Sequence, residues 1–165
     1  MLNFTYNIPT KIIFGKDELG RLPKEILLHG NRVLFLYGKN SIKKTGLYDK
    51  VVSLLNDKGI FFKELSGVKP NPDISSVREG IKIIKENNLD FILAVGGGST
   101  IDCAKAVSAG ANYTGDPWDF LLGKAKVKNV LPIGSILTLA ATGSEMNGGS
   151  VISNENEEIK KEILN

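Results

Sequence analysis

The sequence predicts an α/β domain built on a parallel sheet. Two observations carry this prediction. Strand-type apolar runs alternate with stretches of helical periodicity, an order typical of parallel strands joined by helices. One of these runs, Phe91–Val95, consists of five consecutive apolar residues, as expected for a strand covered on both faces.

Composition narrows the class of protein. The chain has 165 residues, of which 42% are hydrophobic and 24% charged, which suits one soluble domain spanning residues 1–165. The net charge of +3 comes from scattered lysines, so we expect no nucleic-acid partner, and no apolar run is long enough for a membrane partner. The first residues lack the pattern of a signal peptide. The single cysteine, Cys103, excludes an internal disulfide and favours a cytoplasmic location, and the single histidine, His29, excludes a His-rich metal site within this chain.

The N-terminal third begins with two short apolar stretches, residues 4–8 and 11–14, which we interpret as strands separated by Pro9. Residues 17–28 have helical spacing. Pro23 fits this helix only in a first turn or at a break, because proline lacks the backbone N–H that a helix interior needs. We expect His29 at the surface near the C-terminus of the helix.

The middle of the chain repeats the strand and helix order. We predict strands over residues 32–38 and 60–65 and helices over about 42–58 and 74–88. Asp73 is the expected N-cap of the second helix, since its carboxylate can accept from a free N–H of the first turn.

The last third opens with a helix from about residue 100 to 110, whose small side chains permit close packing on the sheet. Residues 113–123 are predicted to be a loop or a short helix, with Trp118 in the core. A strand follows over 130–137, a further strand is possible over 151–153, and the tail 154–165 is charged.

A glycine loop lies between strand 91–95 and the next helix. Gly96, Gly97 and Gly98 allow a sharp turn and a close approach to a ligand. Ser99 is the expected N-cap, and Asp102 can reach back to it as in a capping box. The free N–H groups of this first turn favour a phosphate, and Lys105 would add a cation. The pattern is neither G-x-G-x-x-G nor a Walker loop, so a tight turn without a ligand remains an alternative.

Three such loops follow predicted strands, at residues 38–41, 70–73 and 96–99. Ligands of parallel sheets bind beyond the carboxyl ends of the strands, so we expect these loops to border one nucleotide site. A fourth segment, 138–149, is rich in hydroxyl groups and glycines, which suit the ribose, phosphate and nicotinamide amide of a dinucleotide. A plain connection is the alternative for this segment.

The chain resembles the Rossmann-like N-terminal domain of the iron-containing (group III) alcohol dehydrogenases, and within them the NAD(P)H-dependent butanol dehydrogenase and aldehyde reductase branch. The resemblance spans nearly all of the sequence. Its motifs are the start 9–15, the segment 37–46, the Pro70-Asn71-Pro72 loop, the signature 96–105 and the second loop 138–147.

This resemblance implies hydride transfer between a nicotinamide cofactor and a small alcohol or aldehyde. The cofactor residues that it implies are distributed over the four loops and the tail: Gly38, Lys39, Asn40 and Ser41 at the adenosine ribose; Asn71 at the border; Gly96, Gly97, Gly98, Ser99 and Asp102 in the pyrophosphate signature; Thr138, Leu139, Thr142, Ser144 and Asn147 along the ribose and nicotinamide; and Lys160 at a ribose hydroxyl.

The strand that ends at Gly38 is followed by lysine, asparagine and serine rather than by an acid, and a carboxylate there would repel a 2′-phosphate. We therefore favour NADP(H) over NAD(H). The family also implies iron or zinc, held by an aspartate and three histidines of a helical C-terminal domain. This chain has no counterparts of these ligands, so no catalytic or metal residue is assigned.

Three functions follow as alternatives. The first is the cofactor-binding half of an alcohol dehydrogenase, inactive by itself. The second is an inactive nucleotide-binding or interaction module. The third is a different chemistry on the same scaffold, as in glycerol dehydrogenase or a dehydroquinate-synthase-like lyase, although the loop 142–147 favours the alcohol dehydrogenase branch. Apolar surface left by the missing domain predicts a homo-oligomer, such as a dimer, or another protein partner.

Overall fold

The fold is organised around a four-stranded parallel sheet, as the sequence predicts. The computed structural model describes residues 8–155 and 159–163. The strands are β1 (Arg32–Tyr37), β2 (Phe61–Leu65), β3 (Phe91–Gly96) and β4 (Ile133–Leu137). Their order across the sheet is β2-β1-β3-β4, and all three pairings are parallel. This arrangement confirms the α/β class.

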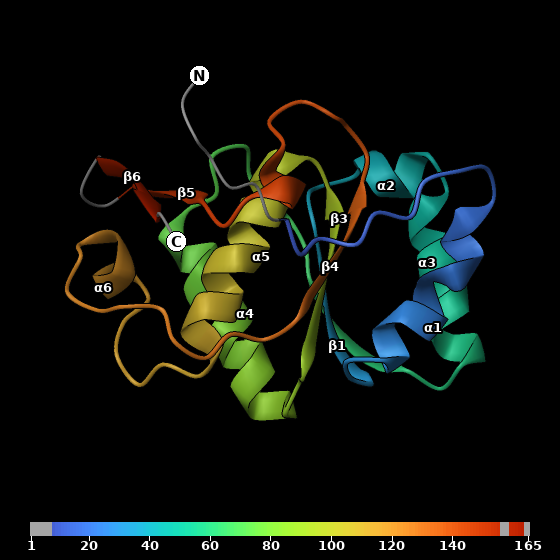
Figure 1. The fold of residues 1–165 in the computed structure, drawn as a ribbon, viewed down its shortest axis with the longest axis horizontal. Helices are drawn as coiled ribbons and strands as arrows, with labels where there is room; N and C mark the ends of the chain where they lie inside the picture. The colour runs from blue at the N-terminus through green and yellow to red at the C-terminus, as the bar shows by residue number, and fades with distance from the viewer. Residues whose placement is uncertain (1–7, 156–158, 164–165) are drawn as a thin grey trace, which may run out of the picture.

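Helices cover both faces of the sheet (Figure 1). One layer contains α1 (Leu22–Leu27), α2 (Ser41–Lys44) and α3 (Leu47–Asp57). The opposite layer contains α4 (Ile74–Asn87) and α5 (Gly98–Ala111), with the short helix α6 (Trp118–Leu121) beside them. Two 3-10 turns complete the helical set, η1 (Glu18–Arg21) and η2 (Ser144–Met146).

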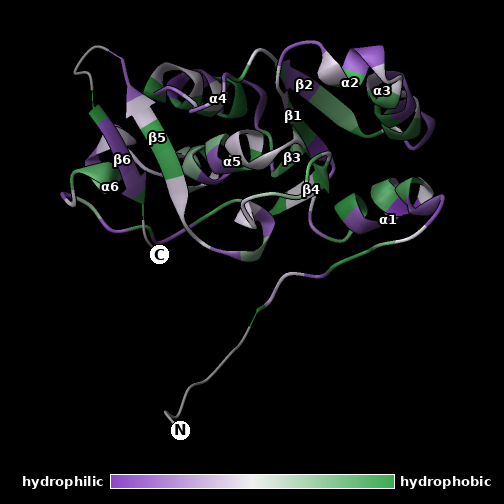
Figure 2. Ribbon diagram, turned by 90° about the horizontal axis from the view of Figure 1, so that it is seen from above, coloured by the Kyte–Doolittle hydropathy of each residue, from purple (hydrophilic) through white to green (hydrophobic). Residues whose placement is uncertain are grey.

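Two hydrophobic cores lie on the two faces of the sheet, because successive side chains of a strand point to opposite faces. In β1, Val33, Phe35 and Tyr37 pack toward α1–α3, whereas Leu34 and Leu36 pack toward α4 and α5. All five are essentially inaccessible to solvent. The green segments that face the sheet in Figure 2 show the same inward placement of apolar residues. Trp118 is buried in the second core, which confirms its predicted place.

Glycines let α4 and α5 approach closely. A Cβ added at Gly80 of α4 would lie 2.8 Å from Cγ2 of Val107, and one added at Gly110 of α5 would lie 2.4 Å from Cδ1 of Ile81. Neither position has space for a larger side chain unless its neighbour moves. The glycines of both helices therefore set the distance between α4 and α5, a contact that the predicted close packing of α5 on the sheet does not include.

The N-terminal prediction is partly wrong. Residues 11–14 form no strand, and Ile12 and Phe14 are exposed, because a strand needs a hydrogen-bonded neighbour and none of the described residues supplies one. The proposed strand over 4–8 falls almost entirely outside the described residues. The helix predicted over 17–28 is divided into η1 and α1, and Pro23 occupies the first turn of α1, which is the placement that proline requires.

Two further boundaries differ from the prediction. The helix expected over 42–58 is split into α2 and α3, since Gly46 adopts a left-handed conformation (φ 71°) that ends one helix and begins the next. The charged tail contains a strand that the sequence did not reveal. Strand β6 (Ile159–Ile163) pairs antiparallel with β5 (Ser150–Asn154), which lies where the possible strand 151–153 was predicted.

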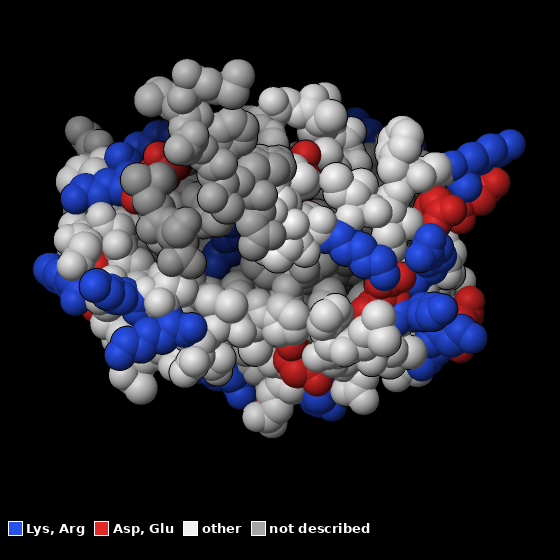
Figure 3. All heavy atoms as spheres, viewed as in Figure 1, with Lys and Arg blue, Asp and Glu red and all other residues white. Residues whose placement is uncertain are grey.

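The surface carries mixed charge. Figure 3 shows basic and acidic side chains interspersed on one face of the molecule. Within the described residues, no helix combines the length and the apolar character needed to cross a bilayer.

Candidate functional site

The loops predicted to hold a nucleotide lie at the carboxyl edge of the sheet. Gly67 N–H donates to the carbonyl of Gly38 (3.1 Å), which joins the loops after β1 and β2. Thr138 N–H donates to the carbonyl of Gly96 (3.0 Å), which joins those after β3 and β4. The orange segment after β4 and helix α2 both lie at this edge, at the top of Figure 1. The edge is where parallel sheets bind ligands.

The glycine loop leads directly into α5. The helix begins at Gly98, two residues before the predicted start, and its N-cap is Gly97 rather than Ser99. No side chain caps this end, so the predicted capping box is wrong; the carboxylate of Asp102 is bonded elsewhere. In the described chain, the N–H groups of Gly98 and Ser99 have no acceptor, whereas those of Thr100 and Ile101 donate to the carbonyl of Gly97. Two free N–H groups at a helix N-terminus suit an anion.

The glycines have different surroundings. A Cβ added at Gly97 would find its nearest neighbour, Cβ of Leu139, 3.9 Å away, so the space beside this residue is open. A Cβ added at Gly98 would lie 2.4 Å from Oγ1 of Thr142. Gly98 is thus a further contact, besides the Thr138–Gly96 hydrogen bond, between the glycine loop and the segment after β4. The glycine loop and the segment after β4, both predicted to contact the cofactor, are therefore in direct contact with each other.

The loop after β1 is the predicted adenosine end. Lys39, Asn40 and Ser41 are exposed, and α2 begins at Ser41. The nearest acid on β2, Glu64, is already engaged, because it accepts from the hydroxyl groups of Tyr37 (2.5 Å) and Tyr48 (2.8 Å). These two bonds tie the carboxylate to Tyr37 of β1 and Tyr48 of α3.

The Pro70–Asp73 loop is fastened to the β5–β6 hairpin. The Nζ of Lys160 donates to Oδ1 of Asn71 (2.9 Å), and the N–H of Ser153 donates to the carbonyl of Pro72 (2.9 Å). Asp73 caps α4 as predicted, accepting from the N–H of Ser75 (2.8 Å). Asn71 itself has a left-handed backbone (φ 53°). The hairpin thereby brings Lys160 to the same edge as the other predicted cofactor residues.

A polar cluster lies behind the second loop. Oγ of Ser144 donates to Oδ1 of Asp102 (2.5 Å), and Nζ of Lys105 donates to Oδ1 of Asn147 (3.0 Å) and to the carbonyl of Gly149 (2.5 Å). Burial lowers the pKa of Lys105, against the opposing effect of Asp102. Lys105 was expected to offer a cation to a phosphate, but in this structure its ammonium group is bound to the second loop.

The described residues do not fit a metal ion. No three His, Cys, Asp or Glu side chains of residues 8–155 and 159–163 are grouped as ligands. His29 is exposed, and its ring lies 6.3 Å from that of Phe91. Cys103 is buried, which raises the pKa of its thiol to about 12.

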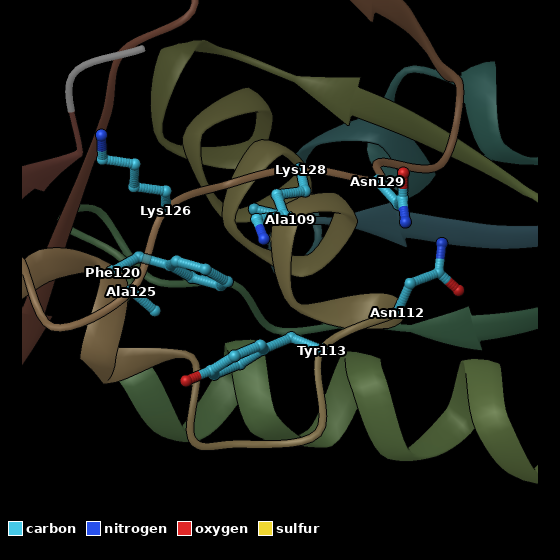
Figure 4. Close-up of a pocket in the computed structure, with 8 residues that line it drawn as sticks. All are labelled: Ala109, Asn112, Tyr113, Phe120, Ala125, Lys126, Lys128 and Asn129. Carbon is cyan, nitrogen blue, oxygen red and sulfur yellow. The ribbon is translucent and has the colours of Figure 1, made fainter.

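A separate hollow of about 330 Å³ lies at the far end of α5. Figure 4 shows Asn112 and Tyr113 at the end of this helix, with Phe120, Lys126 and Asn129 around the opening. Because α5 starts at the glycine loop and Asn112 follows its last residue, this hollow is a helix length from the predicted cofactor edge. It belongs to a different surface.

The chain matches known proteins along most of its length. It is 58% identical over 154 residues to the Probable NADH-dependent butanol dehydrogenase 1 of Bacillus subtilis, a match of 93% of this chain and 40% of that protein. It is 44% identical to the NADPH-dependent aldehyde reductase YqhD of Escherichia coli, with the same coverage. The chain therefore spans about two fifths of the length of these curated relatives.

A solved structure shows the same fold. The NADH-dependent butanol dehydrogenase A of Thermotoga maritima superimposes with a TM-score of 0.95 at 48% identity, over 99% of this chain and 41% of that one. A sequence model of the family described as Iron-containing alcohol dehydrogenase matches residues 9–165. The chain belongs to the iron-containing alcohol dehydrogenase family.

Proposed function

We propose that this chain forms the nicotinamide-dinucleotide-binding part of an oxidoreductase that transfers a hydride between NAD(P)H and a small aldehyde or primary alcohol. The observation that carries the proposal is the carboxyl edge of the sheet. There the free N–H groups of Gly98 and Ser99 lie beside the open space at Gly97. A pyrophosphate requires such donors with no side chain in the way.

The remaining predicted contacts extend along the same edge. The exposed residues 39–41 would meet the adenosine ribose, and Thr138, Leu139 and Thr142 would lie along the nicotinamide half. Lys160, held by Asn71, would reach a ribose hydroxyl. When bound, the dinucleotide supplies or accepts the hydride; the residues of this chain bind it, orient it and hold the second loop against it.

The proposal assigns residues 1–165 to the cofactor-binding domain, and places the metal ligands outside the described residues. Relatives that this chain covers to about 40% carry butanol dehydrogenase or aldehyde reductase in their names, which supports butanal-like aldehydes as substrates. The second candidate is a nucleotide-binding module without catalysis.

The experiment is a titration of the 165-residue chain with NADPH and with NADH, followed by nicotinamide fluorescence. A saturable change that ADP-ribose reverses is expected. No saturable change with either cofactor would contradict the proposal. Addition of butanal and ferrous iron should then give no oxidation of the cofactor, and turnover by this chain alone would contradict the placement of the catalytic ligands elsewhere.

The choice between the cofactors depends on residues 39–41. In the described structure no carboxylate follows β1, which favours NADP(H), whereas the Bacillus relative carries NADH in its name, which favours NAD(H). Lys39→Asp places a negative charge where a 2′-phosphate would lie. We expect it to raise the Kd for NADPH more than that for NADH. Equal effects on both cofactors would contradict a role for Lys39 in this choice.

Exposed apolar residues lie near the open edge strand β4. Val130 is 54% exposed, Ile133 37% and Leu139 67%. We propose that a second copy of the chain or the rest of a longer protein covers these side chains, because exposed apolar surface favours association. Sedimentation velocity should show a dimer or larger species, and a monomer at high concentration would argue against self-association.

A further inference from the structure

We propose that Asp102 and Lys105 act as positioning residues that hold residues 143–149, the last part of the segment that follows β4, against the N-terminal end of α5. The inference rests on the proposed function. It assigns Asp102 a role different from the direct cofactor contact that the sequence predicts. Neither residue needs to touch the dinucleotide in this role.

Asp102 has no free carboxylate oxygen. Oδ1 accepts from the hydroxyl of Ser144 (2.5 Å), and Oδ2 accepts from the N–H of Val151 (3.3 Å). The main-chain carbonyl of Asp102 accepts from the hydroxyl of Ser150 (2.7 Å). Ser144 is 4% exposed, so its hydroxyl depends on this carboxylate for a partner. One residue of α5 thus fixes both ends of the loop.

Lys105 fixes the middle of the same loop. Its side chain is 13% exposed, and its Nζ is bonded to Asn147 and to the carbonyl of Gly149, 3.7 Å from Oδ1 of Asp102. Asn147 then closes the loop on itself: Oδ1 accepts from the N–H of Gly149 (3.0 Å) and Nδ2 donates to the carbonyl of Gly143 (3.0 Å). A buried ammonium without these partners would be costly, so loop and helix stabilise each other.

The loop held in this way continues from Thr142, which packs on Gly98 at the proposed pyrophosphate site. Asp102 and Lys105 lie about one and two turns along the same helix. The helix therefore presents its free N–H groups to one half of the cofactor while its side chains order the segment that faces the other half.

The test compares Asp102→Asn, Ser144→Ala and the double variant. Asparagine has one acceptor oxygen, so either Ser144 or the N–H of Val151 must face an amide NH₂. Each chain is titrated with NADH and with ADP-ribose, which lacks the nicotinamide. Hydrogen exchange of the 143–151 amides is measured without cofactor. Asp116→Asn is the matched control, because Asp116 also accepts from a side chain and a backbone N–H but lies at the start of α6.

We expect Asp102→Asn to raise the Kd for NADH about tenfold, which corresponds to the loss of one hydrogen bond to a charged group, and the Kd for ADP-ribose by less than about twofold. Exchange within 143–151 should be faster, Ser144→Ala should have a similar effect, and the double variant should bind no more weakly than Asp102→Asn. The control should leave the ratio of the two affinities unchanged.

Three results would overturn the inference. Unchanged hydrogen exchange with weaker NADH binding would identify Asp102 as a direct contact. Equal weakening of both ligands would indicate a general loss of structure. Additive effects of the two substitutions would show that Asp102 acts independently of Ser144. If the unsubstituted chain binds neither ligand, the proposed function fails, while the exchange measurement still decides whether Asp102 orders the loop.

Discussion

Gly97 offers the sharpest separation of cofactor binding from folding. Its backbone has φ −92° and ψ −170°, a conformation that alanine adopts readily, and an added Cβ would lie no closer than 3.9 Å to another residue. The substitution Gly97→Ala therefore creates no clash within the protein. The new methyl group would instead occupy the open space that the proposed pyrophosphate needs.

The expected effect on stability is small. Alanine is a poorer N-cap than glycine, at a cost of about 0.5–1 kcal/mol. It also restricts the unfolded chain, which stabilises by about 0.4–1 kcal/mol where the native backbone is unstrained. These two contributions oppose each other, so the free energy of unfolding should remain within about 0.5 kcal/mol of the original value.

The expected effect on binding is large. A pyrophosphate kept away from Gly98 and Ser99 loses two charge-assisted hydrogen bonds of about 1.5–3 kcal/mol each. The Kd for NADH should thus rise by more than roughly a hundredfold. Fluorescence titration measures the binding and urea denaturation the stability. Gly20→Ala is the control, because a Cβ at Gly20 would not clash either, meeting nothing within 4 Å, and this residue lies in η1. A Kd for NADH within threefold of the original value would refute the position of the pyrophosphate, because a tenfold change in Kd corresponds to only about 1.4 kcal/mol.

Three further predictions concern the rest of the fold. Gly80→Ala should lower the free energy of unfolding, measured in urea, by about 1–2 kcal/mol, because the cost of the clash with Val107 exceeds the gain in helix propensity. Adding Val107→Ala should relieve part of this loss. Burial and the nearby Asp102 raise the pKa of the Cys103 thiol to about 12. At pH 8 this thiol should therefore react with iodoacetamide more than about a hundredfold slower than in the urea-unfolded chain. Equal rates would show that the thiol is accessible. The hydrogen bond from Arg78 lowers the pKa of Asp116 in the folded chain. Its contribution to stability is therefore present above about pH 4, the pKa of an aspartate in the unfolded chain, and is lost as the pH falls through the lower pKa of the folded chain. Asp116→Asn should remove that part of the acid dependence of thermal unfolding.

The sequence predicted well the elements whose signals are local. Strand β3 is a continuous apolar run, and α4 combines helical spacing with the cap at Asp73, so neither depends on distant residues. For α5, close packing is predicted only toward the sheet; its short distance to α4 is a finding of the structure, in which Gly80 and Gly110 leave no room for a Cβ. The start of α5 was misplaced by two residues, because Ser99 has the side chain of an N-cap although the backbone turns already at Gly97.

The errors arise where structure depends on a partner. Residues 11–14 have strand composition but no neighbouring strand within the described chain. Strand β6 has the opposite problem, because its surface face contains Lys160 and Glu162 and the segment resembles a solvated tail. Its pairing with β5 brings Lys160 to Asn71 across 89 positions of sequence. A contact of that separation has no local signal, although the family resemblance indicated both residues.

Helix α5 connects the parts of the candidate site. Its first N–H groups face the open space at Gly97, its contact with Thr142 joins the two loops, and Asp102 and Lys105 hold the second loop in place. The opposite face of the helix is fixed against α4 by contacts too close to admit a methyl group. One helix carries all of these contacts, so it joins both loops to the core. The site is thus positioned by the packing of α5 between the sheet and α4, which explains why small residues occupy so much of this helix.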